Sequence, residues 1–266
     1  LQLLVQAATD PNPADRPSDV REFLRMLDDV EEELTAPEPE RGALPADARQ
    51  GDLLSGGFKV LRRLGAGSTC HALAVENPEG QQGVLKVAKD PSFNERLRQE
   101  YDTLLDVPHP NIVKAFGIHE IDGLTAIFIE QAGHRTMGQR LREQGPLSLD
   151  LLERFGDELL AVLVHLEREG INHRDIKPEN IGLGETRKRA LTLKLFDFSL
   201  ARAPAENIRA GTPPYLDPFL SLRQPPRWDL HAERFAAAMT LHEMATGTLP
   251  TWGGAGQDPA SSDEDV

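Results

Sequence analysis

The chain of 266 residues has little cysteine and no long apolar run, and both absences narrow its class. Its single cysteine, Cys70, cannot form an internal disulfide and is too solitary for a structural zinc site, which fits a reducing compartment. The apolar clusters near 159–166 and 235–241 stop well short of the ~20 residues that a membrane-spanning helix needs. Because the chain begins at Leu1 and carries no secretory leader pattern, we expect a fragment of a longer cytoplasmic protein without a membrane anchor.

Positive charge is also scarce, since the formal net charge is -14. Residues 1–52 hold 13 acids against 5 bases, and the tail from Asp258 adds 4 acids, so most of the excess lies in the two flanks. Binding to nucleic acid through phosphate neutralisation needs clustered Lys and Arg. We therefore expect no nucleic-acid partner for this region and interpret the flanks as solvated acidic segments.

The distribution of apolar residues predicts where domains begin and end. Residues 18–34 place apolar side chains at helical spacing with acids on the other side, which predicts an amphipathic helix. Residues 35–50 are rich in Pro, Ala and charge without an apolar period, as in a linker. We predict that residues 1–34 are the C-terminal end of a preceding helical domain and that 35–52 are a linker. A domain in two parts follows over 53–132 and 133–252, and an acidic flexible tail over 253–266.

The domain after the linker has two parts of different character. Over 58–129, short β-branched and apolar runs alternate with glycine-bearing turns, and one polar helix over 91–105 interrupts them. Further on, Ser148 can cap a helix that Gly170 can end in a left-handed turn, and a second helical run spans 232–246. The expected fold class is α+β, with a small sheet-rich part followed by a mainly α part.

The strongest chemical signal follows the capped helix and reads His173-Arg174-Asp175-Ile176-Lys177-Pro178-Glu179-Asn180. It resembles the catalytic loop H-R-D-x-x-x-x-N of eukaryotic-type protein kinases, which include the bacterial Hanks-type Ser/Thr kinases. The resemblance implies a bilobal kinase fold, with Asp175 as catalytic base, Asn180 as a Mg²⁺ ligand and Lys177 as partner of the γ-phosphate. The alternative interpretation of the same run is an ordinary polar turn after a helix.

Other segments similar to kinase motifs occur in the family's order. In Leu64-Gly65-Ala66-Gly67, glycines would let backbone amides approach phosphate, although Gly-x-Gly also suits any hairpin. Lys86 would reach the α and β phosphates and Glu100 would pair with it, although either could be an ordinary surface residue. Asp197-Phe198-Ser199 resembles D-F-G, which makes Asp197 the second Mg²⁺ ligand.

The remaining kinase-like segments imply how substrates would bind. Thr212 in Gly211-Thr212-Pro213-Pro214-Tyr215 would face the protein substrate near Asp175, and Glu130 and Ala132 would form the hinge behind gatekeeper Ile129. The cofactors implied by the resemblance are ATP and Mg²⁺. The residues expected at the ATP site are Leu64, Gly65, Ala66, Gly67, Ala72, Val84, Lys86, Ile129, Glu130, Ala132 and Asp197.

Several positions depart from the kinase pattern. Cys70 replaces the third glycine of the loop, Ser199 replaces the glycine of D-F-G, and Phe219 replaces the glutamate of A-P-E. Glu233 stands where the central-helix aspartate caps the catalytic loop. Gly182 stands where a leucine lies below adenine, so we expect a roomier pocket. These departures keep open a nucleotide-binding pseudokinase or an interaction module as alternatives to an active kinase.

The resemblance covers about residues 53–252, and further helices would complete a kinase domain beyond them. Residues 7–17, with the helix that follows, resemble the closing A-x-x-P-x-x-R-P and last helix of another kinase domain, although an unrelated helical hairpin is the alternative. Together with the segments 197–201, 215–219 and 232–235, this layout resembles the large tandem-kinase protein of bacterial phage growth limitation (BREX) defence systems. That resemblance implies partner proteins of a defence system besides a protein substrate.

The loop between Ser199 and Thr212 contains no Ser, Thr or Tyr. In this family an arginine at the position of Arg174 commonly pairs with a phosphate added to that loop. We therefore predict activity without loop phosphorylation. Glu206 could offer Arg174 a carboxylate in place of the phosphate, or could simply be solvated.

Overall fold

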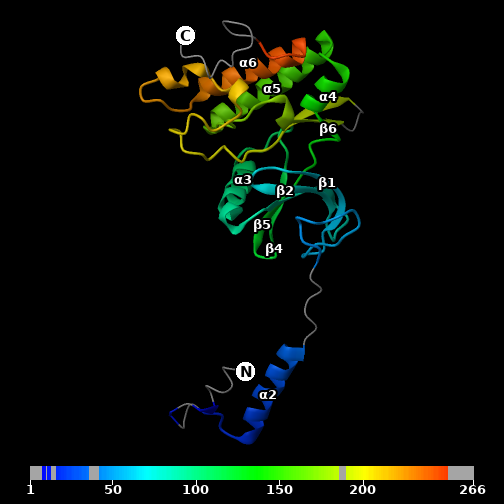
Figure 1. Cartoon of the computed structure of the whole chain (residues 1–266), viewed down its shortest axis with the longest axis vertical. Helices are drawn as coiled ribbons and strands as arrows, with labels where there is room; N and C mark the ends of the chain where they lie inside the picture. The colour runs from blue at the N-terminus through cyan, green and yellow to red at the C-terminus, as the bar shows by residue number, and fades with distance from the viewer. Residues whose placement is uncertain (1–7, 10, 13–15, 36–41, 186–189, 251–266) are drawn as a thin grey trace. The chain divides into compact units, whose positions relative to one another are not determined.

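The computed structural model describes residues 8–9, 11–12, 16–35, 42–185 and 190–250, apart from the side chains of 28–35. The chain divides into two compact units, Leu1–Gly42 and Ala43–Val266 (Figure 1). Among the described residues, none of the helices has the length and apolar character that crossing a bilayer requires.

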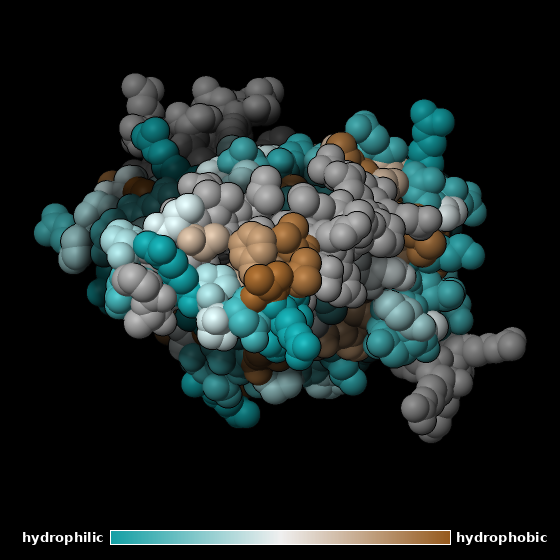
Figure 2. Space-filling view, turned by 90° about the horizontal axis from the view of Figure 1, so that it is seen from below, coloured by the Kyte–Doolittle hydropathy of each residue, from teal (hydrophilic) through white to brown (hydrophobic). Residues whose placement is uncertain are grey.

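The first unit contains the predicted amphipathic helix, α2 (Val20–Thr35). Asp19 begins it, because its Oδ1 accepts the backbone N–H groups of Arg21 and Glu22, each at 2.8 Å. Five residues of the 7–17 motif (7, 10 and 13–15) lie outside the described residues, so its kinship with a kinase terminus stays a prediction. Among the coloured residues in the view of Figure 2 most are hydrophilic, and a group of hydrophobic residues lies near the centre. Among the described side chains of α2, the exposed large apolar ones are Val20, Leu24 and Leu27.

The second unit starts with a five-stranded antiparallel sheet, in the order β1-β2-β3-β5-β4. Successive side chains of a strand point to opposite faces, so Leu85 and Val87 are fully buried in one core cluster while Val84 and Lys86 face the other side. Helix α3 (Asn94–Asp106), entered through the 3-10 turn Pro91–Phe93, packs against β4 and β5. The strands are β1 (Lys59–Ala66), β2 (Cys70–Glu76), β3 (Gln82–Ala88), β4 (Ala115–Ile121) and β5 (Leu124–Ile129).

This compact unit begins earlier than the predicted domain start at residue 53. The N–H of Ala43 donates to Leu53 O at 2.9 Å, and Ala48 and Leu54 are buried beside Phe58. These apolar residues have no regular spacing, so pattern analysis assigns their segment to the linker. Their burial nevertheless makes residues 43–52 part of the small lobe.

The large lobe is mainly helical (Figure 1). Its long helices α5 (Leu149–Glu169) and α6 (Leu230–Thr246) pack against each other, and α4 (Met137–Gln144) precedes them. Gly170 ends α5 with φ 68°, as predicted, and Ser148 stands at its N-cap without a side-chain cap hydrogen bond. A small sheet ordered β6-β7-β8 comprises β6 (Arg135–Thr136), β7 (Ile181–Glu185) and β8 (Leu191–Leu195). The short 3-10 turns are Pro178–Asn180, Pro213–Tyr215 and Pro218–Leu222.

A sheet-rich small lobe with one packed helix, followed by a helical lobe, confirms the predicted α+β bilobal fold. The strand β5 leads directly into the segment that joins the lobes, so the lobes meet along residues 130–134. The cavity described below lies at this junction.

Candidate active site

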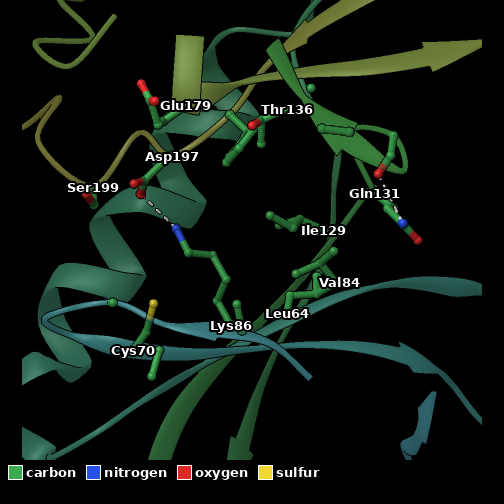
Figure 3. Close-up of a pocket in the computed structure, with 18 of the residues that line it drawn as sticks. Leu64, Cys70, Val84, Lys86, Ile129, Gln131, Thr136, Glu179, Asp197 and Ser199 are labelled. Carbon is green, nitrogen blue, oxygen red and sulfur yellow. Dashed lines mark hydrogen bonds and ion pairs between the residues drawn. The ribbon is translucent and has the colours of Figure 1, made fainter. Parts of the chain in front are cut away.

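One cavity of about 780 Å³ lies between the small-lobe sheet and the strand β7. Figure 3 shows Leu64, Val84 and Ile129 converging on it, with Lys86 reaching across from β3. The glycine-rich turn closes one side, where the Gly67 N–H donates to Cys70 O at 3.0 Å. Every residue that the sequence assigned to the ATP site lines this cavity: Leu64, Gly65, Ala66, Gly67, Ala72, Val84, Lys86, Ile129, Glu130, Ala132 and Asp197.

Lys86 is held between two carboxylates. Its Nζ lies 2.6 Å from Glu100 Oε1 and 2.9 Å from Asp197 Oδ1 (Figure 3 shows the second contact). Burial lowers the pKa of Lys86, but the charges of Asp197 and Glu100 outweigh burial and raise it above the ordinary value. Burial by itself raises the pKa of Asp197, yet Lys86 and the Ser199 side chain hold that pKa below the usual range. The site therefore keeps an ammonium group and an ionised carboxylate side by side.

Glu100 is the deepest member of this group. Its side chain is 1% exposed, burial raises its pKa against the opposing charge of Lys86, and its Oε2 has no hydrogen-bond partner among the described residues. A buried carboxylate of this kind is tolerated only when a cation compensates it. The charge of Lys86 therefore stabilises the buried carboxylate of Glu100, just as Glu100 stabilises the buried ammonium group of Lys86.

The catalytic-loop residues form a second polar cluster. Lys177 Nζ donates to Asp175 Oδ2 at 2.7 Å and to Thr212 Oγ1 at 2.6 Å, and Thr212 Oγ1 donates to Asp175 Oδ1 at 2.6 Å. Asn180 Nδ2 donates to Asp175 Oδ2 at 2.8 Å. The predicted set Asp175, Lys177, Asn180 and Thr212 is therefore brought together around one carboxylate that can accept a hydroxyl proton.

The donors present suit a hard cation. In the part of the chain that the structure describes, no cluster of three or more His, Cys, Asp or Glu could hold a metal alone. Asn180 uses its amide nitrogen on Asp175, which leaves its amide oxygen for a ligand. Asp197 adds a partly exposed carboxylate at the cavity wall. Two oxygen donors with room for phosphate oxygens and water fit Mg²⁺, which is commonly bound by few protein ligands.

Buried side chains hold the catalytic loop in place. His173, fully buried, lies edge-on to Phe198 with ring centroids 4.5 Å apart, and burial lowers its pKa. Glu233 Oε1 accepts the Arg174 N–H at 2.8 Å, so this longer side chain still caps the loop. The same oxygen accepts the indole N–H of Trp228 at 2.7 Å. Trp228 was not singled out in the sequence, because it precedes the recognisable helix pattern by several residues.

The pocket floor contradicts the expectation of extra room below adenine. A Cβ built on Gly182 would lie 2.3 Å from Ala132 Cβ and 2.6 Å from Ala132 O. The neighbouring Gly133 adopts φ 137° and passes so close to Leu183 O that a side chain there would overlap it. The hinge therefore packs directly on β7, and the space that a leucine would fill is occupied by Ala132. Phe196, which the sequence analysis did not assign to the pocket, also lines it.

The other departures from the kinase pattern have local consequences. Cys70 is the buried first residue of β2 and therefore lies after the turn. The two glycines Gly65 and Gly67 remain in the turn itself. The backbone carbonyl of Ser199 accepts Arg96 Nε at 3.1 Å. Phe219 is 44% exposed, but the buried Asp217 nearby pairs with Arg223 at 2.5 Å. An ion pair thus exists close to the site where the A-P-E glutamate would have formed one.

The lobes, the cavity between them and the Lys86–Glu100 pair define the class of two-lobed kinase folds. Comparison with known families gives the same result, since a model described as "Protein kinase domain" matches residues 58–265 and the chain belongs to this family. It is similar to the probable kinase PglW of Streptomyces coelicolor, with 40% identity over 98% of this chain and 19% of that protein. It is also similar to a probable serine/threonine-protein kinase of Corynebacterium efficiens, with 32% identity over 62% of this chain and 26% of the relative.

A third relative is the serine/threonine-protein kinase PrkC of Bacillus subtilis, which is 26% identical over 75% of this chain and 32% of its own length. The chain therefore spans between a fifth and a third of the length of these relatives. The likeness to PglW agrees with the resemblance to phage growth limitation kinases that the sequence indicated.

Proposed function

We propose that the chain is a Ser/Thr protein kinase that transfers the γ-phosphate of ATP to hydroxyl groups of a protein substrate. The observation that carries the proposal is the joint geometry of two clusters, Lys86 between Glu100 and Asp197, and Asp175 between Lys177 and Thr212. An ion pair can be purely structural. Lys86 and Asp197, however, line a cavity large enough for a nucleotide, which favours a functional role for this pair.

The proposed reaction assigns a role to each charged group. Asp175 accepts the proton of the substrate hydroxyl. The hydroxyl oxygen forms a bond to the γ-phosphorus, and the bond between the γ-phosphorus and the β–γ bridging oxygen breaks to release ADP. Lys177, 2.7 Å from Asp175, neutralises charge on the transferred phosphoryl group. Lys86 contacts the α and β phosphates. Asn180 and Asp197 would hold Mg²⁺, which supplies neutralisation of phosphate charge when bound.

The partners and location follow from the same proposal. The protein substrate would be a Ser or Thr acceptor, favoured by the lysine two residues after Asp175. A role in phage growth limitation, with partner proteins of that system, is supported by the likeness to PglW. ATP as phosphate donor and the single cysteine support a cytoplasmic location.

The test is turnover with labelled ATP. The whole chain is treated with phosphatase, and ³²P transfer to itself and to casein is measured beside Asp175→Asn, which should reduce the rate by about 10² or more. Phosphoamino-acid analysis should yield phosphoserine and phosphothreonine, and dominance of phosphotyrosine would reject the Ser/Thr assignment. Tight Mg-ATP binding without any transfer would favour the pseudokinase alternative instead.

A further inference from the structure

The loop from Ser199 to Ala210 has a defined path although it offers no hydroxyl for phosphorylation between residues 200 and 211. Short internal turns shape it, with the N–H groups of Ala201, Ala203 and Asn207 each donating to a carbonyl three residues earlier at 3.0 Å. Such turns order the loop locally but do not attach it to the rest of the site. Its attachment must come from contacts with other segments of the chain.

Arg202 joins the loop to α3. Its Nε donates to Thr103 Oγ1 at 3.0 Å, and its Nη2 lies 2.7 Å from Asp106 Oδ2. Thr103 is 1% exposed and its hydroxyl donates to Gln99 O at 2.7 Å, so the Arg202 contact completes the hydrogen bonding of this hydroxyl. Thr103 is one helical turn from Glu100, and Arg202 is therefore tied to the same helix that presents Glu100 to Lys86.

Arg174 is occupied by a different set of groups. It is 4% exposed, its Nη1 donates to Pro204 O at 2.9 Å, and its guanidinium lies 5.6 Å from the ring centroid of Trp228. The backbone N–H of Trp228 donates to Ala205 O at 2.7 Å. Among the described residues no direct ion pair joins Glu206 to Arg174, but the charge of Glu206 acts on the guanidinium, because it opposes the lowering of the Arg174 pKa by burial. A carbonyl and an indole take the place that a loop phosphate would have.

We propose that these contacts replace loop phosphorylation, and that Arg202 is a positioning residue which keeps Glu100 beside Lys86 by joining the activation loop to α3. The inference rests on the proposed kinase function and concerns its regulation. Arg96 supports it from the other end of α3, because its Nε donates to Ser199 O at 3.1 Å. The helix is thus attached to the loop through residues on both sides of Glu100.

The experiment compares Arg202→Ala with a matched control in the same loop, Arg209→Ala. Arg209 is exposed and has no hydrogen bond or ion pair in the described structure. The whole chain is dephosphorylated, checked by mass spectrometry, and assayed for initial rate. Wild type should start without a lag, Arg202→Ala should lower kcat about three- to tenfold, and Arg209→Ala should stay within about twofold.

A charge-swapped pair separates positioning from loss of stability. Arg202→Asp combined with Asp106→Arg reverses the ion pair, and it should recover a large part of the rate that Arg202→Asp alone loses. A lag in wild type that prior phosphorylation abolishes would overturn the proposal. Equal rates for Arg202→Ala and Arg209→Ala would overturn it as well.

Absence of turnover in wild type would refute the kinase function without deciding the structural inference. Amide hydrogen exchange then decides it, because Arg202→Ala should raise exchange in residues 94–106 relative to Arg209→Ala. Equal exchange of α3 in the two variants would show that Arg202 does not position this helix.

Discussion

The buried carboxylate of Glu233 should make folding stability depend on pH, and Glu233→Gln should remove that dependence. Glu233 is 3% exposed, its Oε1 accepts two N–H groups, and its Oε2 has no partner among the described residues. A neutral glutamine keeps an acceptor at Oε1. The substitution therefore changes the charge while retaining the hydrogen bonds from Arg174 and Trp228.

The magnitude follows from the pKa in the folded chain. Burial raises the pKa of Glu233 from 4.5 to about 7, against the hydrogen bonds from Arg174 and Trp228, which lower it. Because the folded pKa is above the unfolded one, the folded state binds the proton more tightly. That contribution to stability is complete below pH 4.5 and is lost as pH rises to about 7. At about 1.4 kcal/mol for each pH unit, wild type loses about 3 kcal/mol of unfolding free energy through this group.

The assay is urea unfolding of the wild type and Glu233→Gln over a pH series from about 4.5 to 8. The difference in unfolding free energy between the two proteins is the quantity to follow, since His173 and Arg174, which face Glu233, are common to both. The unfolding free energy of wild type minus that of Glu233→Gln should fall by about 3 kcal/mol between the acid end and the alkaline end of the series. Parallel pH profiles would refute the reasoning and mean that Glu233 ionises in the folded chain as it does in water.

Two further predictions concern the nucleotide cavity. Lys86→Met and Asp197→Ala should each weaken Mg-ATP binding in calorimetry by about tenfold or more, because each removes a charged contact to phosphate or metal; unchanged affinities would reject both assignments. Gly182→Ala should cost about 1–3 kcal/mol of stability in urea unfolding, because its Cβ would meet Ala132 at 2.3 Å. Gly184→Ala is the control on the same strand, with its nearest contact at 3.5 Å, and equal costs for both would disprove the close approach.

The charged groups of the site could be predicted from the sequence because chemistry constrains their spacing. Asp175 and Asn180 lie five residues apart and share a hydrogen bond, as the catalytic-loop pattern requires. Lys86 and Asp197 are 111 residues apart, yet each sits in its own recognisable segment, so their meeting followed from the resemblance. Helix ends with a physical signal, such as the left-handed Gly170, were predicted for the same reason.

Contacts between segments that carry no motif could not be predicted. The approach of Ala132 to Gly182 depends on the path of the hinge. From the sequence, glycine in place of leucine at position 182 indicated an empty space, and this expectation was wrong. The burial of Ala48 depends on isolated apolar residues in a stretch rich in Pro and charge, where periodicity gives no signal. Trp228 lies outside the helix pattern, and only the folded chain brings its indole to Glu233.

The departures from the kinase pattern are matched by contacts elsewhere in the fold. A longer acid at Glu233 still reaches the catalytic-loop backbone, and Trp228 occupies the same oxygen, so its charge has two donors. Asp217 is buried and would be costly without a cation, and Arg223 supplies one while also contacting Asp229, the cap of α6. At these two positions the loss is offset locally, and Lys86 still lies within ion-pair distance of both Glu100 and Asp197. The charged groups proposed for phosphoryl transfer therefore remain in place despite the departures.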